Sequence, residues 1–404
     1  MSAKLSKQQE RRATVYTAFF LAWRQLKRAS IWTSLLIISI MTLTFLNLVV
    51  ISGILVGLIQ GASVAARGQY SADIILQNLP AENFISQSEE IINFLEAQPE
   101  VAAVSGRYLG SATLEANYTS VKDPDERRNS TSVTIAGVDP LAEAKVADIN
   151  HEIELGRNLV PQDRNRVLVG AGYLAGYSVE QIPGEILLEN VEPGTSLKLT
   201  IDGVDRIVKV AGLVDSKVFE VNRRVFMPAA EVKQMFGRTD NNRSEIVVKL
   251  TDPDRDLTEF IAKLRQTPLL ANNAQIKDWR EAQGATLQDI SDTFSVLGNI
   301  IGSIGLAIAS ITIFIIIFIN AVNRRPYIGI MKAIGVRARV IELSYIIQSV
   351  IYATIGSALG LMLLYLVLIP YVDANPIDFP FSDGILVAPI AGTAIRVVIL
   401  IIVT

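Results

Sequence analysis

Residues 31–60 read IWTSLLIISIMTLTFLNLVVISGILVGLIQ, and no charged residue occurs anywhere between Arg28 and Arg67. A helix that crosses about 30 Å of hydrocarbon needs about 20 apolar residues. This stretch exceeds that length, and it is about twice as long as the apolar region of a secretory signal. It therefore predicts an uncleaved membrane-spanning helix rather than a signal peptide, and it makes the chain a membrane protein.

Three more apolar stretches lie late in the 404-residue chain, at residues 293–322, 341–371 and 384–404. The last of them contains Arg396. A central arginine costs about 2.5 to 3.5 kcal/mol on insertion, and each Ile, Leu or Val offsets roughly 0.3 to 0.6 kcal/mol of that cost. The apolar residues around Arg396 outweigh it, so we predict four transmembrane helices in total.

Basic residues cluster before the first span and after the second span. They are Lys4, Lys7, Arg11, Arg12, Arg24, Lys27 and Arg28 before the first span, and Arg324, Arg325, Lys332, Arg337 and Arg339 in the loop 323–340. Basic flanks are retained on the cytoplasmic side. The pattern therefore predicts a cytoplasmic N-terminus, with residues 61–292 and the short loop 372–383 outside.

Residues 1–30 are predicted to hold an amphipathic helix, from Tyr16 to Arg28, that lies in the inner membrane interface. A simple N-terminal extension of the first span is the alternative. Within the second span, Gly302 and Gly305 suit close helix packing, either between two protomers or within one chain.

The region 61–292 has the composition of a soluble domain and predicts a large mixed α/β (α+β) fold with two lobes. Asp202-Gly203 between alternating apolar residues predicts a hairpin. Residues 101–116 predict one or two strands broken at Gly106 and Gly110. A helix from Lys277 to Asp292 is expected to run straight into the second span.

Residues that would support catalysis are scarce. The chain has no cysteine and one histidine, His151, which we interpret as a surface residue. It also lacks a Gly-x-x-x-x-Gly-Lys-Ser/Thr phosphate loop, so it cannot bind ATP by that route. A net charge of −3 gives no signal for nucleic acid. We predict no catalytic or metal-binding residues, and the substrate-binding residues are unknown at this stage.

The loop between the second and third spans reads NRRPYIGIMKAIGVRAR from Asn323 to Arg339. Pro326 suits the first turn of a helix and Gly335 suits its end. A short amphipathic helix here, parallel to the membrane, could receive a push from a cytoplasmic ATPase. The segment from Ile328 to Gly335 resembles the coupling helix of MacB/FtsX-type ABC permeases.

Other segments are similar to the MacB-like periplasmic core domain in order and spacing. They are Gly156-Arg-Asn-Leu159, Arg166-Val-Leu-Val-Gly170, Val208 to Gly212, and Val225-Phe-Met-Pro228. The resemblance covers nearly the whole chain. It implies that residues 61–292 form such a core domain and that residues 293–404 form an FtsX-like transmembrane domain.

Two features depart from the family pattern. Tyr327 stands where the family commonly has a glutamate, which puts in doubt any ATPase contact that depends on that acid. The family usually continues past the fourth span with a short basic tail, whereas this sequence ends at Thr404 inside an apolar run. We therefore expect that the sequence is cut short or lacks the tail.

The resemblance implies a permease subunit in the bacterial inner membrane that works by mechanotransmission, without ATPase activity of its own. ATP and Mg²⁺ would be held by a partner ABC ATPase. The other partners implied are a second permease copy, as homodimer or related heterodimer, the lipid bilayer, and a periplasmic adaptor or membrane-fusion protein. No nucleic acid is expected. The residues assigned to ATPase coupling are Arg324, Arg325, Tyr327, Ile328, Gly329, Ile330, Met331, Lys332, Ala333, Ile334 and Gly335.

The leading function is export or extraction of a lipoprotein, lipid, peptide or hydrophobic drug. The alternative is an FtsX-like signal transmitter that activates a cell-wall hydrolase and transports nothing. A membrane-anchored enzyme is disfavoured because no catalytic constellation is present.

Overall fold

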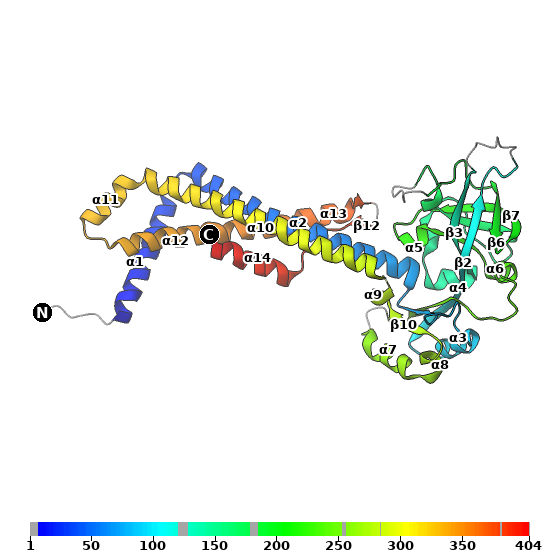
Figure 1. Cartoon of the computed structure of the whole chain (residues 1–404). Helices are drawn as coiled ribbons and strands as arrows, with labels where there is room; N and C mark the ends of the chain where they lie inside the picture. The colour runs from blue at the N-terminus through cyan, green and yellow to red at the C-terminus, as the bar shows by residue number, and fades with distance from the viewer. Residues whose placement is uncertain are drawn as a thin grey trace. The chain divides into compact units, whose positions relative to one another are not determined.

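The computed structural model describes residues 7–119, 128–177, 185–252, 256–282, 284–379 and 382–403 (Figure 1). The chain divides into two compact units. The first comprises Met1–Ile59, Ile290–Ile377 and Gly384–Thr404, and the second comprises Gln60–Asp289 and Asp378–Asp383. Two long helices, α2 (Ile31–Ala66) and α10 (Gly284–Asn323), contribute residues to both units.

The first unit is helical. Besides α2 and α10 it contains α1 (Lys7–Lys27), α11 (Arg325–Ala333), α12 (Ala338–Leu363), α13 (Ile369–Ala374) and α14 (Ile390–Val403). A π-helical segment, Leu364–Leu368, joins α12 to α13, and the short strands β11 (Ile377–Phe379) and β12 (Ser382–Gly384) pair with each other.

Three helical stretches are long and apolar enough to cross a membrane: Ile31–Ser71, Asp292–Thr312 and Ala338–Ala374. The apolar stretch Ile390–Ile402 in α14 is shorter. A membrane crossing needs about 20 residues, whereas α14 has 14. The structure thus supports a membrane-embedded chain, and the count of four spans stays a prediction.

Helix α2 buries one narrow stripe of side chains. Ile37, Met41, Phe45 and Val49 recur every four residues, the spacing of one helix face, and all four are buried. Opposite them on α12 stand glycines. A Cβ added at Gly356 would lie 2.4 Å from the Cβ of Met41, so only glycine permits this approach of the two helices.

The second unit is built on one ten-stranded sheet. Its strands are β1 (Ile74–Gln77), β2 (Val101–Glu115), β3 (Ser130–Val138), β4 (Ile153–Gly156), β5 (Arg166–Gly170), β6 (Ser196–Ile201), β7 (Val204–Val214), β8 (Arg224–Pro228), β9 (Glu245–Leu250) and β10 (Gln275–Asp278). The strand order is β10-β1-β9-β2-β3-β8-β5-β7-β4, and β6 pairs with β2 and β7.

Helices cover this sheet. They are α3 (Ser88–Glu96), α4 (Pro140–Val146), α5 (Phe219–Asn222), α6 (Ala229–Met235), α7 (Leu257–Gln266), α8 (Pro268–Ala271) and α9 (Trp279–Ala282), with 3₁₀ turns at Ile149–Glu152 and Ala171–Tyr173. A π-helical segment, η1 (Arg67–Ser71), follows α2 directly.

The region predicted to have two lobes forms one compact unit, so the two-lobed organisation stays a prediction. Three hydrophobic clusters pack on its sheet, and two of them separate the ends of the region from its middle. One core unites β1, β9 and β10 with α3 and α7, through buried residues such as Ile74, Ile91 and Phe260. The other unites β3 and β5 to β8 with α6, through residues such as Val133 and Val210. The first core is made from the two sequence ends of the region, and the second from its middle.

The predicted hairpin is confirmed. Ile201 of β6 pairs with Val204 of β7, and the two residues between them, Asp202 and Gly203, have φ values of 47° and 82°. Positive φ at both central positions is the geometry of a type I′ turn, whose twist matches that of the flanking strands.

One local prediction was wrong, and another was wrong at its start. Strand β2 runs unbroken through Gly106 and Gly110. Instead, the glycines leave room for side chains packed on the strand. A Cβ at Gly110 would lie 2.4 Å from the Phe236 ring. The predicted helix does run into the second apolar stretch, as α10 from Gly284, but Lys277 lies in strand β10, paired with Ile75. Pairing with β1 buries Ile276 and overrides the local helical pattern.

Candidate functional site

Helix α11 follows α10 and precedes α12 in the chain, and it contains or directly adjoins every residue predicted for ATPase coupling. Pro326 stands in its first turn, where its missing N–H costs no hydrogen bond. At the other end Gly335 has φ of 89°, and the N–H of Val336 donates to the carbonyl of Met331 at 3.0 Å. This bond and that of Gly335 to Lys332 form a Schellman cap, which explains why a glycine ends the helix.

The side chains of α11 divide into two sets. Tyr327, Ile330 and Ile334 are 68%, 60% and 75% exposed. Ile328 and Met331 are half-buried. Large apolar side chains that stay exposed on a short helix indicate a surface prepared for a partner or for lipid.

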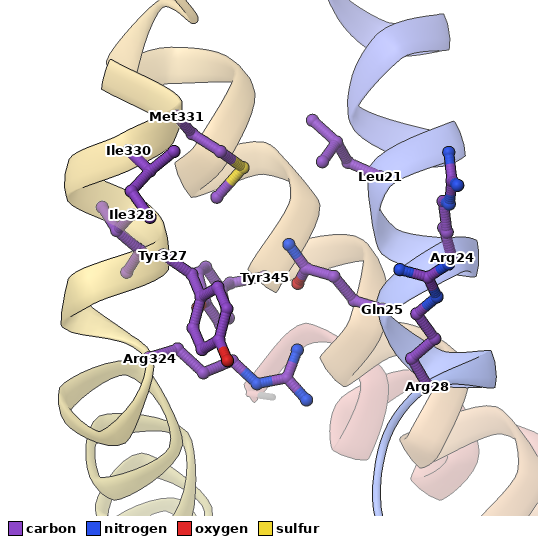
Figure 2. Close-up of a pocket in the computed structure, with 10 residues that line it drawn as sticks. All are labelled: Leu21, Arg24, Gln25, Arg28, Arg324, Tyr327, Ile328, Ile330, Met331 and Tyr345. Carbon is purple, nitrogen blue, oxygen red and sulfur yellow. The ribbon is translucent and has the colours of Figure 1, made fainter. Parts of the chain in front are cut away.

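A cavity of about 500 Å³ lies between α1, the start of α11 and α12 (Figure 2). Its lining combines cationic, aromatic and apolar side chains, namely Leu21, Arg24, Gln25, Arg28, Arg324, Tyr327, Ile328, Ile330, Met331 and Tyr345. Five of the residues predicted for coupling therefore share this cavity with the N-terminal helix, which sequence reasoning had not linked to them.

Helix α1 is a helix of its own. The chain leaves helical structure after Lys27 and α2 begins at Ile31, so α1 is no extension of the first span. Its small residues Ala18 and Ala22 are fully buried, and Gln348 of α12 donates a 2.7 Å hydrogen bond to Gln25. Its aromatic residues Phe19, Phe20 and Trp23 are about half exposed, as expected of a helix at a membrane interface.

The segments of the second unit that carry the family resemblance meet in neighbouring strands, β8-β5-β7-β4. Gly156 has φ of 87° and approaches Ala211 so closely that a Cβ would lie 2.4 Å from its carbonyl oxygen. Arg157 binds Asp163 through two hydrogen bonds of 2.8 and 2.6 Å. That pairing holds the pKa of Asp163 below its usual range. These residues close the loop between β4 and β5, and their role is structural.

A buried charge cluster in the second unit was missed by sequence reasoning. Arg107 donates to Glu143 at 2.6 and 2.9 Å, and Arg224 donates to Glu245 at 3.2 and 3.4 Å. Burial alone would raise the pKa of Glu245, but the guanidinium groups of Arg224 and Arg107 hold it below its usual value. The positive charges of the two arginines equal the negative charges of the two glutamates, so we interpret the cluster as structural. No spacing of these four residues in the sequence signals their contact.

His151 is on the surface, as predicted, and its Nδ1 lies 2.8 Å from the Asp148 carboxylate. Within the described ranges, no group of three or more His, Asp or Glu side chains could hold a metal ion.

These features define a membrane-embedded protein with a mixed α/β domain and a capped helix between two apolar helices. Two family models match the chain: the MacB-like periplasmic core domain over residues 34–267 and the FtsX-like permease C-terminal model over residues 299–404. The first alone covers more than half of the chain. The chain therefore belongs to the MacB/FtsX family of ABC permeases.

Curated relatives are similar along most of the chain. The macrolide export ATP-binding/permease protein MacB 1/2 of Paracoccus denitrificans is 24% identical over 77% of this chain and 47% of its own length. The probable syringafactin export ATP-binding/permease protein SyfD of Pseudomonas syringae is 23% identical over 80% of this chain and 50% of its own length. The chain thus spans about half the length of these relatives.

Two solved structures are similar to part of the chain. The periplasmic region of MacB from Actinobacillus actinomycetemcomitans is 15% identical over 54% of this chain and 93% of its own length, with a TM-score of 0.36. The extracellular domain of the ABC-type transporter YknZ from Gram-positive bacteria is 17% identical over 51% of this chain and 99% of its own length, with a TM-score of 0.31. Both scores are below 0.5, so the family assignment depends on the sequence matches.

Proposed function

We propose that this chain is the permease subunit of an ABC-type assembly that works by mechanotransmission. ATP hydrolysis by a cytoplasmic partner would drive export or extraction of a substrate on the outer side of the membrane. The observation that carries the proposal is α11, a capped helix between two candidate spans that keeps Tyr327, Ile330 and Ile334 exposed. A separate ATPase is the partner that fits this surface.

The names of the relatives support a link between this permease and an ATP-binding protein. The sequence has no phosphate loop of the Gly-x-x-x-x-Gly-Lys-Ser/Thr type. The relatives from Paracoccus and Pseudomonas are named ATP-binding/permease proteins, and this chain aligns with about half of each. We propose that a partner ABC ATPase holds ATP and Mg²⁺.

The length of α10 supports the transmission of motion. It is one helix of 40 residues, about 60 Å at a rise of about 1.5 Å per residue. Only Arg324 separates its last residue from α11. A push on α11 would thus act directly on the end of a long rigid element, and the assembly need not open a pore.

The names of the relatives favour export over signalling. One is named for macrolide export and another for syringafactin export. We infer a hydrophobic or amphipathic substrate, which includes the lipoprotein, lipid, peptide and hydrophobic drug classes. The basic N-terminus and basic loop support an inner-membrane orientation with α11 on the cytoplasmic side.

The matched pair Gly329→Pro and Gly329→Ala tests the role of α11. No described atom lies within 4 Å of a Cβ added at Gly329, so alanine fits and favours the helix by about 1 kcal/mol. Proline removes a helical hydrogen bond and costs about 3 kcal/mol. The tagged full-length chain is purified from its native membranes, and co-purifying ATPase protein and activity are measured.

We expect an ATPase to co-purify with the native chain and with Gly329→Ala, and to be lost or uncoupled with Gly329→Pro. Equal recovery of the ATPase with both variants would disprove the role of α11. Absence of any ATPase with the native chain would overturn the permease proposal itself. A substrate-stimulated ATPase rate in the purified assembly would separate export from the signalling alternative.

A further inference from the structure

The cavity beside α11 has a strongly positive lining. Arg24 lies in α1, Arg28 directly follows α1, and Arg324 precedes α11. In Figure 2 Arg324 reaches toward α1, while Arg24 and Arg28 extend along the opposite wall. No ion pair joins any of these three arginines to another residue in the described part of the chain.

The sequence explains why these charges stay uncompensated. No Asp or Glu occurs between Glu10 and Asp73, or between Asp292 and Glu342. The segments that build the α1 and α11 walls therefore contain no acid of their own at this end of the helices. Like charges that share a cavity repel each other, and an anion bound among them relieves that repulsion.

A second feature of the cavity points to a ligand independently of charge. The hydroxyl of Tyr345, on α12, is buried and has no hydrogen-bond partner among the described residues. A buried hydroxyl without a partner is costly, and such groups are rare in folded proteins. Tyr345 lines the cavity, so a small rotation of its side chain would bring this hydroxyl to an acceptor bound there.

The lining favours a phosphate ester that also has an apolar part. Guanidinium groups, a tyrosine hydroxyl and the Gln25 amide supply donors for phosphate oxygens. Leu21, Ile328 and Met331 supply an apolar wall beside them. Around the cavity, α1 exposes Phe19, Phe20 and Trp23, the residue types that gather where a membrane meets water.

We propose that this cavity binds the phosphate headgroup of an anionic phospholipid from the inner leaflet. The lipid would bridge α1 and α11 and so hold the N-terminal helix against the coupling helix. The inference rests on the proposed function only for the orientation that places α11 at the inner leaflet. It does not require the ATPase.

The test compares two triple variants with the same change in charge. The cavity variant is Arg24→Gln, Arg28→Gln, Arg324→Gln, and the control variant is Arg11→Gln, Arg12→Gln, Arg339→Gln. The control arginines are exposed, lie outside the cavity and come from the same two basic segments. Each full-length chain is placed, without ATPase, in nanodiscs of equal phosphatidylglycerol and phosphatidylcholine, then extracted, and retained lipids are counted by mass spectrometry.

We expect the native chain and the control variant to retain phosphatidylglycerol over phosphatidylcholine. Removal of each cavity arginine should lower that preference about fivefold, and removal of all three by about a hundredfold. Tyr345→Phe should lower it several-fold without lowering the thermal unfolding temperature, since the hydroxyl makes no hydrogen bond within the described protein. If Tyr345 had only a structural role, Tyr345→Phe would not lower the phosphatidylglycerol preference while leaving the unfolding temperature unchanged.

Three results would overturn the proposal. Equal loss in the cavity and control variants would show nonspecific attraction to anionic membranes. Displacement of the retained lipid by millimolar inorganic phosphate would indicate a site for free phosphate. Unchanged phosphatidylglycerol retention together with lost ATPase co-purification would assign the arginines to the ATPase contact. Retention of phosphatidylglycerol by a Gly329→Pro chain that has lost the ATPase would support the lipid site independently of ATPase coupling.

Discussion

At the scale of single residues, we expect replacement of Glu245 to lower the stability of the second unit. It is buried, and it accepts hydrogen bonds from Arg224 and from the Tyr70 hydroxyl. Glu245→Gln keeps the shape but removes the charge, which leaves the buried Arg224 without its carboxylate partner. We expect the free energy of unfolding to fall by about 3 to 5 kcal/mol, as when one member of a buried ion pair is removed.

Thermal unfolding of the full-length chain in detergent measures this change. The exposed Glu154 provides the control, and Glu154→Gln should change stability by less than about 0.5 kcal/mol. If both variants unfold alike, the cluster around Glu245 contributes little and the buried pairing is not a stabilising element.

Acid dependence follows from the lowered pKa of Glu245. A glutamate in the unfolded chain titrates at about pH 4.3, and the folded one titrates lower. Its stabilising contribution is therefore complete above that unfolded value and is lost as the pH falls through the folded pKa. The native chain should lose more stability below about pH 4 than Glu245→Gln does, and unfolding temperatures measured from roughly pH 3 to roughly pH 6 check this.

At the scale of elements, the contact of α2 with α12 depends on Gly356 and Gly360. A Cβ at Gly360 would lie 2.4 Å from the Phe45 ring, and Thr42 donates a 3.1 Å hydrogen bond to the Gly356 carbonyl. Gly356→Leu should separate the helices and cost about 1 to 3 kcal/mol through overpacking. Ala358→Leu, exposed on the same helix, is the control.

Unfolding temperature in detergent and the monodisperse fraction on size-exclusion chromatography report the effect of Gly356→Leu. Both should fall for Gly356→Leu and stay unchanged for Ala358→Leu. A Gly356→Leu chain as stable as its control would mean that the two helices do not pack at these glycines.

Prediction from sequence succeeded where one element's own pattern decides its structure. Charge-free length indicated the apolar helices, and Asp202-Gly203 indicated the hairpin. It failed where the answer depends on a distant partner, since Gly110 is explained by Phe236 and Lys277 by pairing with Ile75. At the candidate site, Pro326 and Gly335 predicted α11 and its ends. The cavity could not be predicted, because Tyr345 and Arg28 meet only through the packing of α1 on α12.

The same limit applies to small residues in apolar helices. Gly302 and Gly305 were predicted to pack closely, yet sequence spacing does not say which neighbour a glycine faces. A Cβ added at Gly305 would lie 3.0 Å from Oδ1 of Asn47 on α2, whereas one added at Gly302 would meet no described atom within 4 Å. Helix α10 thus approaches α2 at Gly305, whereas the neighbouring Gly302 has free space beside it among the described residues.

At the scale of the whole molecule, we expect a second permease copy to pack at Gly302, because a small residue permits close approach of two helices in lipid. Gly302→Leu should leave the folded chain intact, since no described atom within 4 Å opposes the new side chain. It should weaken self-association about tenfold or more by overpacking the contact between copies. Ala307→Leu, exposed elsewhere on α10, is the control. Energy transfer between labelled chains in liposomes measures association, and equal association of both variants would place the contact between copies on another face.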